Sequence, residues 1–208
     1  MKNYRVEVCV EHYDEAISAQ RAGADQIEFC SRLDLDGLSP KPEDLDLLIK
    51  ELDIPIKPML RLREGGFIYS PMEKANILSY LEDIIDFDFA SVVFGALNEA
   101  GAVDIDFLED ILTILDGKKL FFHKAIDYSA NIEESCIILS KYEQVCGVLS
   151  SGGQQTAWEG RAKLKKMRTI LSPHQELMPA GRILPENIEQ LHAYLNFDSY
   201  HGRRIIKY

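Results

Sequence analysis

Hydrophobic and polar residues along this chain alternate between two periodicities. Short runs rich in β-branched and aromatic residues are separated by longer segments with the spacing of amphipathic helices. The short runs predict eight strands, at residues 5–9, 25–29, 56–61, 90–94, 119–123, 145–149, 176–179 and, with a weaker pattern, 197–200. The longer segments predict seven helices, at residues 13–22, 43–52, 71–86, 104–115, 131–142, 155–171 and 185–195.

This repeated strand–helix order is typical of a parallel sheet whose strands are joined by helices. Eight such units favour a (β/α)8 TIM-type barrel over an open doubly wound sheet, because the sequence lacks a G-x-G-x-x-G turn after its first strand. Only eight residues follow the last predicted strand, so we expect a barrel without a full eighth helix. No linker-like stretch interrupts the series, which indicates one domain over residues 1–208.

Composition narrows the class of protein. Of 208 residues, 46% are hydrophobic and 27% are charged, as in globular domains and unlike disordered chains. The 34 acidic and 23 basic residues give a net charge of −11, which disfavours nucleic acid and membrane surfaces as partners. With no signal-peptide core and no apolar run of membrane-spanning length, we expect a cytoplasmic protein. Its four scattered cysteines predict free thiols.

The first two predicted strands carry the same pattern of alternating faces. Apolar residues at alternate positions form the face that packs against helices, which turns Glu7, Cys9, Glu28 and Cys30 toward the barrel interior. The same parity turns five further side chains inward: Met59, Arg61, Arg63, Phe121 and His123. Charged groups inside a barrel are costly unless they pair or bind something. The inward charges indicate either a network of ion pairs whose members pair only with one another or a functional site at the C-terminal strand ends.

Glycine-containing loops follow three of the predicted strands at that same end, at residues 64–66, 150–153 and 180–182. Glycine lets the backbone approach a ligand closely, and free N–H groups attract anions. We therefore expect an anion pocket formed by Ser151, Gly152, Gly181 and Arg182 beside the arginines of the third strand. The simpler interpretation is that these glycines only turn the chain.

Seven stretches of the sequence are together similar to the CutC copper-homeostasis family. In chain order they are VEVCV (6–10), RAGADQIEFCSRLDLDGLSP (21–40), MLRLREGGFIYS (59–70), VVFGALNEAGAVD (92–104), FFHKAID (121–127), VLSSGGQQTAWEG (148–160) and MPAGRILPENI (178–188). The resemblance implies a (β/α)8 barrel in a cytoplasmic, usually oligomeric protein associated with copper tolerance and trafficking. It also implies two strand-end cysteines as copper ligands, which are Cys9 and Cys30 in this sequence.

Copper binding is the first of two functions that these residues favour. Copper(I) is soft and prefers thiolate ligands, so Cys9 and Cys30 suit it if their neighbouring strands bring them together. Buried cysteine is also common in protein cores, and packing alone would explain both residues.

The alternative is an enzyme acting on a small carboxylated or phosphorylated metabolite. Glu28, His123 and Asp127 would supply an acid and a base, while Arg61 and Arg63 would clamp the anion. A barrel that only binds a protein partner would need neither the thiols nor these groups. The sequence leaves the choice open.

The short C-terminal segment also bears on assembly. Residues 202–208 are too few to cover the seam between the last strand and the first, so apolar surface should stay exposed beside the helices at 13–22 and 185–195. Such patches usually mark interfaces. We expect a homodimer or a larger even-numbered homo-oligomer, with His201 at the rim of the site.

Overall fold

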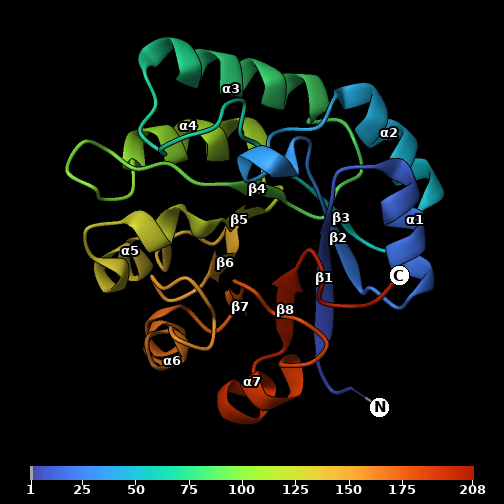
Figure 1. The fold of residues 1–208 in the computed structure, drawn as a ribbon. Coiled ribbons are helices and arrows are strands. Elements are labelled where there is room, and N and C mark those ends of the chain that lie inside the picture. The colour runs from blue at the N-terminus through green and yellow to red at the C-terminus, as the bar shows by residue number, and fades with distance from the viewer. Residues whose placement is uncertain (1) are drawn as a thin grey trace.

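The computed structural model describes residues 2–208 and confirms the (β/α)8 barrel. Figure 1 looks onto the C-terminal ends of a ring of strands that the α-helices surround. The strands are β1 (Arg5–Val10), β2 (Gln26–Phe29), β3 (Ile56–Pro58), β4 (Val92–Phe94), β5 (Leu120–Phe122), β6 (Val145–Ser150), β7 (Glu176–Pro179) and β8 (Ser199–Gly202). The helices are α1 (Tyr13–Arg21), α2 (Pro42–Glu51), α3 (Pro71–Ile84), α4 (Ile105–Leu115), α5 (Ile132–Leu139), α6 (Arg161–Ile170) and α7 (Ile188–Leu195), with short 3-10 helices η1 (Leu33–Leu35) and η2 (Lys124–Tyr128).

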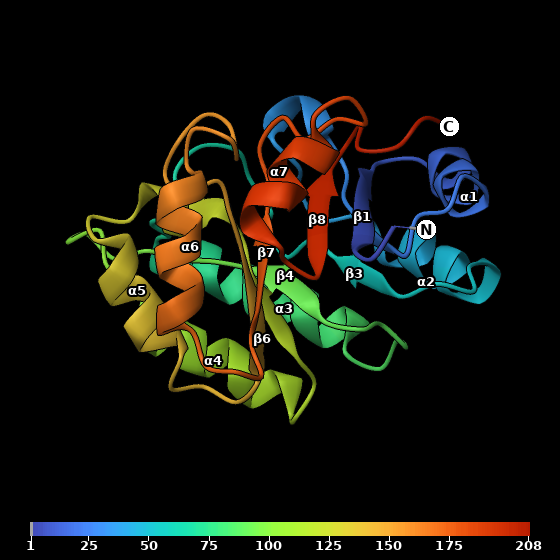
Figure 2. The ribbon, with the colours of Figure 1, turned by 90° about the horizontal axis from the view of Figure 1, so that it is seen from below.

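The ring consists of two parallel half-sheets. One has the strand order β3-β2-β1-β8 and the other has the order β4-β5-β6-β7. At the β3–β4 seam, a parallel bridge joins Met59 to Val93, and the N–H of Ala90 donates to the carbonyl of Ile56 at 2.9 Å. At the β7–β8 seam, side chains make the contact, because the Ser199 hydroxyl donates to the Glu176 carboxylate. Figure 2 shows the ring from the side, with η1 and the C-terminal strand ends at the top.

Several helices begin where their capping residues predict. Ser70 and Glu73 form a reciprocal capping box at the start of α3, and Pro71 occupies its first turn, where no N–H is needed. Asp104 and Asn131 accept backbone N–H groups at the starts of α4 and α5. These local signals fix the helix starts, and the buried faces of the helices then cover the outside of the strands.

Several observed boundaries differ from the predicted ones, and two of the differences bear on the end of the barrel that carries the site. The helix expected at residues 155–171 begins only at Arg161, because residues 151–160 form a loop in which Gly152 and Gly153 have positive φ angles of 69° and 71°. The last strand, expected at 197–200, runs instead from Ser199 to Gly202, where it pairs in register with β1. This shift moves His201 from the rim into a strand.

Two apolar clusters result from the alternation of strand faces. The larger one fills the space between strands and helices and includes Val6, Val8 and Ile27, as the parity of the first two strands predicts. The smaller one fills the barrel interior with eight buried residues: Cys9, Cys30, Met59, Val93, Phe121, Leu149, Met178 and Ala180. The interior therefore contains sulfur-bearing and aromatic side chains beside its charged groups.

The C-terminal segment after β8 is not helical in the described residues 203–208, as expected. Ile205 is buried against the core, and Tyr208 remains 48% exposed. The homo-oligomer that this segment led us to expect stays a prediction. Within the described part of the chain, no helix combines the length and apolarity needed to cross a membrane.

Candidate functional site

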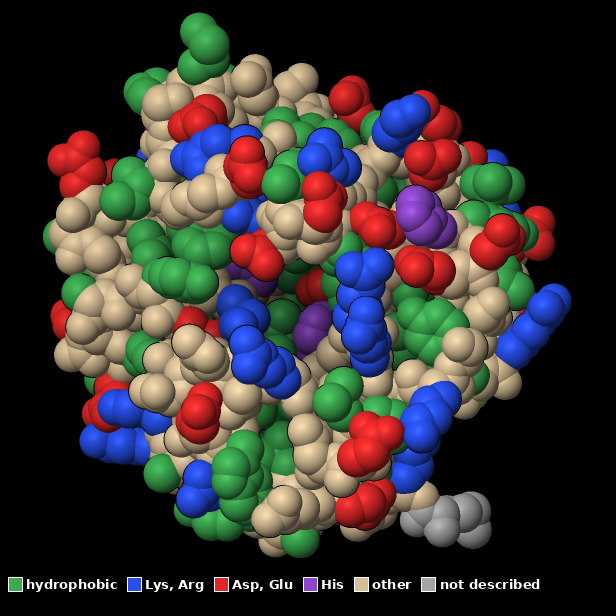
Figure 3. Space-filling model, viewed as in Figure 1, with side chains coloured by type: hydrophobic (Ala, Val, Ile, Leu, Met, Phe, Trp, Pro, Cys, Tyr) green, Lys and Arg blue, Asp and Glu red, His purple; other side chains and the backbone are tan. Residues whose placement is uncertain are grey.

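The C-terminal end of the barrel is hollowed at its centre (Figure 3). In this view, His side chains lie inside the hollow, and Lys or Arg side chains stand on its rim. Two groups of functional side chains lie at this end. One is a pair of thiols within a network of buried charges, and the other is a cavity beside them.

Cys9 and Cys30 lie on neighbouring strands with their sulfur atoms 3.7 Å apart. Cys9 is on β1, and Cys30 follows β2 directly, where its N–H donates to the carbonyl of Val10. Both are buried, at 7% and 1% exposure. Gly37, at φ +84°, makes room for this arrangement, since a Cβ at that position would lie 3.2 Å from the Cys30 sulfur.

Both thiols are protonated at neutral pH. The hydrogen bond with Cys30, burial and the charge of Glu28 together raise the pKa of Cys9 well above its usual value. The hydrogen bond with Cys9 lowers the pKa of Cys30, but burial and Glu28 outweigh it and raise that pKa to about 11. These side chains are therefore weak nucleophiles, and binding a metal would require them to release protons.

A network of buried charges lies against the thiol pair. One carboxylate oxygen of Glu7 lies 2.8 Å from the Lys57 ammonium nitrogen, and the other lies 2.8 Å from Nδ1 of His201. Nε2 of His201 lies 3.7 Å from Glu28, which in turn accepts the Cys30 thiol at 3.7 Å. Burial raises the pKa of Glu7, but Lys57 and His201 outweigh it and hold that pKa at about 2.

Burial alone would lower the pKa of His201, but Glu28 and Glu7 overcome this effect and raise it. The Lys57 ammonium and the His201 ring thus both lie against the carboxylates of the network. Its members sit at 1–9% exposure, and such pairing is what keeps buried charges tolerable.

The sequence did not lead us to expect Lys57 in the charge network or His201 at its centre. The parity that turns Met59 inward also turns Lys57 inward, so the signal for Lys57 was available. The sequence placed His201 only at the rim of the site, because the register with β1 sets its position in the network.

A cavity of about 420 Å³ opens at the same end of the barrel. Arg61, His123 and Lys124 line its polar side, and its apolar walls are Met59, Phe67, Tyr128 and Leu149. Met59 also belongs to the interior cluster that contains Cys9 and Cys30, so the cavity and the thiols are neighbours.

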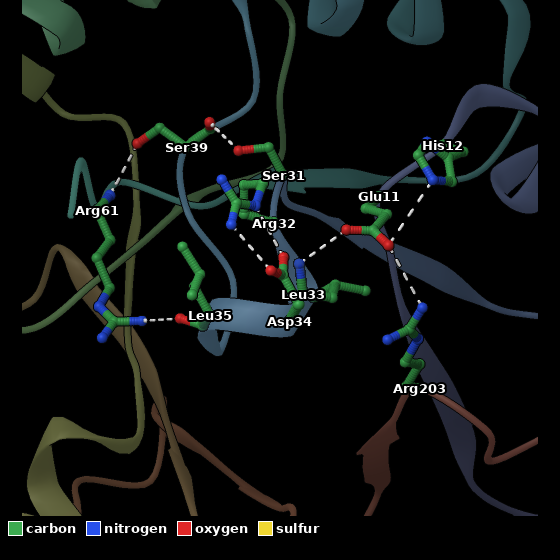
Figure 4. A network of polar contacts seen from close by, with 10 residues as sticks. All are labelled: Glu11, His12, Ser31, Arg32, Leu33, Asp34, Leu35, Ser39, Arg61 and Arg203. Carbon is green, nitrogen blue, oxygen red and sulfur yellow. Dashed lines mark hydrogen bonds and ion pairs between the residues drawn. The ribbon is translucent and has the colours of Figure 1, made fainter. Parts of the chain in front are cut away.

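Arg61 is held in this cavity by backbone carbonyl groups. Its Nη1 donates to the carbonyls of Leu35, Asp36 and Gly37 at 3.2–3.3 Å, and its Nη2 donates to that of Gly65 at 2.9 Å. Ser39 accepts the backbone N–H of Arg61, and a chain of polar contacts continues through η1 (Figure 4). The inward position of Arg61 agrees with the prediction, although β3 ends before it at Pro58.

His123 occupies the cavity as a neutral ring. Its Nδ1 accepts the N–H of Ala125 at 3.1 Å, which places the ring proton on Nε2. Burial lowers the pKa of His123 to about 3, and the charge of Arg61 acts in the same direction. At neutral pH this side chain offers a hydrogen-bond donor at Nε2 and carries no charge.

Arg63 does not enter the site, contrary to the parity prediction. Its guanidinium pairs with Glu73 on α3 and donates to the carbonyls of Gly66 and Ile68. The chain has left β3 before this residue, so alternation no longer determines where its side chain lies.

Asp127 is also engaged elsewhere. Its carboxylate accepts the hydroxyls of Ser150 and Ser151 at 2.5 and 2.9 Å and the N–H groups of Ser151 and Gly153 at 2.9 Å. The loop after β6 thus binds the carboxylate of Asp127, a group of the protein itself. Asp127 does not line the cavity, and its carboxylate takes up the donors of Ser151 that the expected anion pocket would use.

Gly181 and Arg182 line a different depression, between the loop before α6 and α7, with Trp158 and Leu191. The N–H of Ala157 donates to the carbonyl of Gly181 at 3.0 Å, which ties the two loops together. The predicted constellation of acid, base and anion clamp is therefore divided, and only Arg61 and His123 share the cavity.

Two groups of side chains bring three candidate metal-binding atoms within 4.8 Å of one another: Cys9 with Glu28 and Cys30, and Glu7 with Glu28 and His201. The first group offers two soft sulfur atoms and one oxygen, a donor set that suits copper(I). Oε1 of Glu28 is buried without a hydrogen-bond partner among the described residues. The second group is already neutralised by Lys57, so the first fits a metal better.

Comparison with known proteins extends the resemblance seen in the sequence. A model of the CutC family matches residues 4–206. The chain is 32% identical to a CutC family protein of Treponema denticola over 97% of this chain and 81% of that one. It is 29% identical to the copper homeostasis protein cutC homolog of Homo sapiens, over 90% of this chain and 68% of that one.

Solved structures agree with these relatives. The CutC protein of Streptococcus agalactiae superimposes with a TM-score of 0.90 at 21% identity, over 98% of this chain and 100% of that one. Phosphoribosyl anthranilate isomerase of Thermotoga maritima shares the barrel fold, with a TM-score of 0.58 at 14% identity over 95% of this chain and 86% of that one. The family-model match over residues 4–206 and the 32% identity to the Treponema denticola protein show that this chain belongs to the CutC family.

Proposed function

We propose that this protein takes part in copper homeostasis by holding one copper(I) ion between the thiolates of Cys9 and Cys30. The observation that carries the proposal is the 3.7 Å separation of the two sulfur atoms on hydrogen-bonded neighbouring strands. The name of the human relative, copper homeostasis protein cutC homolog, supports the same role.

The surroundings of the two thiols favour copper(I) over a harder ion. Copper(I) prefers a small number of soft ligands, and the interior cluster places the Met59 thioether in the same group of side chains. Glu28 is the only carboxylate in the three-residue group, which is too few for a calcium or magnesium site. A monovalent cation that replaces two protons leaves one added negative charge at this site.

The competing hypothesis, an enzyme that uses Glu28, His123 and Asp127, has less support. Asp127 is engaged with the loop after β6, and Glu28 belongs to the buried charge network. Acid–base catalysis needs its groups within hydrogen-bond reach of one substrate.

A competition titration with a copper(I) chelator, under anaerobic reducing conditions, tests the proposal. The wild-type protein should take up one copper(I) per chain, and Cys9→Ser or Cys30→Ser should weaken its binding at least tenfold, because each removes a soft ligand. Cys136→Ser is the matched control, since Cys136 is buried in α5 away from the interior cluster. Equal uptake by all four proteins would refute the ligand assignment.

A further inference from the structure

The cavity beside the thiols contains two buried hydrogen-bond donors with no acceptor. Among the described residues, neither Nε of Arg61 nor Nε2 of His123 has a hydrogen-bond partner. Both side chains are about 4% exposed, and both line the cavity. A buried donor without a partner is costly, so two of them on one cavity call for an explanation.

The missing partner must accept hydrogen bonds. Nδ1 of His123 is occupied by the N–H of Ala125, which leaves the ring with a donor at Nε2. The other two guanidinium nitrogens of Arg61 each donate to backbone carbonyls, and Nε is the nitrogen without a partner among the described residues. An oxygen that accepts from both nitrogens would complete the hydrogen bonding of the two side chains.

Charge favours an anion in this position. Arg61 and Lys124 contribute two positive charges to the lining, and Asp36 is its one acidic residue. His123 adds a donor without adding charge. The cavity is therefore positive although the protein as a whole carries a net charge of −11.

The opposite wall of the cavity is apolar and partly aromatic. The ring of Phe67 lies 5.0 Å from that of His123 and 5.4 Å from that of Tyr128, and the Arg61 guanidinium lies 5.2 Å from the Phe67 ring. Phe67 therefore packs against both donor side chains. Leu149 and Met59 complete a surface that suits a flat apolar group.

We propose that this cavity binds a small organic anion, a carboxylate or a phosphate monoester on a flat apolar body, whose oxygen atoms accept from Arg61 and His123. The site is separate from the copper ligands, and its ligand reaches it from the open end of the barrel. Nothing in this proposal depends on copper binding.

Calorimetric titration with benzoate and with phenyl phosphate tests the proposal and separates the two sources of negative charge. At least one probe should bind with one-to-one stoichiometry, and benzyl alcohol, which lacks the charge, should bind at least tenfold more weakly. His123→Phe keeps a ring and removes the donor, and it should weaken binding about tenfold or more. Lys124→Gln removes one charge and should weaken binding several-fold.

Two matched variants control for effects elsewhere on the protein. His12 is exposed, and Lys119 lines the cavity at the opposite end of the barrel, so His12→Phe and Lys119→Gln should bind like the wild type. Cys9→Ser should also bind like the wild type, which separates this proposal from the one on copper. If His123→Phe fails to fold, Lys124→Gln carries the test. Absence of saturable binding by both probes, or equal affinity in wild type and Lys124→Gln, would overturn the proposal.

Discussion

Glu7 and His201 face each other as register partners on β1 and β8, with 2.8 Å between the carboxylate oxygen and Nδ1. This contact joins the first and last strands of the barrel inside its core. Lys57 on β3 holds the other oxygen of the same carboxylate, so one side chain links three strands of a half-sheet. The charge network therefore supports the strands that carry the two thiols.

Replacing Lys57 should destabilise the fold strongly. Lys57→Met leaves the buried Glu7 carboxylate without its main counter-charge, and breaking a buried pair in this way costs about 3–5 kcal/mol. Urea denaturation measures the change in the free energy of unfolding. Lys207→Met, at a lysine whose side chain is 81% exposed, is the control and should change it by less than about 0.5 kcal/mol. If Lys57→Met and Lys207→Met changed the free energy of unfolding by similar amounts, the stabilising role of the Lys57–Glu7 ion pair would be contradicted.

Acid should destabilise the protein through His123. Its pKa is about 3 in the folded state and 6.5 in the unfolded state, so between these values only the unfolded state binds the proton. The stabilisation that neutral His123 contributes is complete above pH 6.5. Below that pH, the free energy of unfolding falls by about 1.4 kcal/mol for each unit by which the pH is lowered. His123→Phe should remove that slope between about pH 6 and pH 4, measured by denaturation at each pH. An unchanged slope would show that His123 is not buried as a neutral ring, and His12→Phe is the control.

Copper(I) affinity should rise with pH. Both thiols have raised pKa values, so each bound ion displaces two protons at neutral pH, and the association constant should rise roughly 100-fold per pH unit. Competition titrations at two pH values, corrected for protonation of the chelator, measure this slope. A constant affinity across that range would mean that the metal uses ligands other than these two thiols.

Asp127→Asn should loosen the loop after β6 without affecting either site. The amide that replaces the carboxylate offers one acceptor oxygen and a donor NH2 group, which cannot satisfy four donors. We expect a loss of about 3 kcal/mol in the free energy of unfolding, with copper and benzoate binding preserved. Asp110→Asn, at an exposed position of α4, provides the comparison. A selective loss of benzoate binding would instead restore Asp127 to the anion site.

The inward faces of the strands could be predicted because alternation is local. Cys9 and Glu28 follow directly from the two-residue period of β1 and β2. Arg63 could not be placed, because the chain leaves the strand before it and an ion pair with α3 decides its direction. The partners of Asp127 lie 23–26 residues along the chain, and no periodicity reports a contact of that kind.

The division of the ring into two half-sheets places the two candidate sites differently. Cys9 and Cys30 belong to one half-sheet, where backbone pairing of β1 with β2 fixes the spacing of their sulfur atoms. The cavity lies across the β3–β4 seam, with Arg61 following β3 and His123 following β5. Widening of that seam would change the width of the cavity while the sulfur spacing stayed constant. The residues proposed to hold copper thus lie within one half-sheet, whereas the cavity proposed to bind an anion spans the junction of the two.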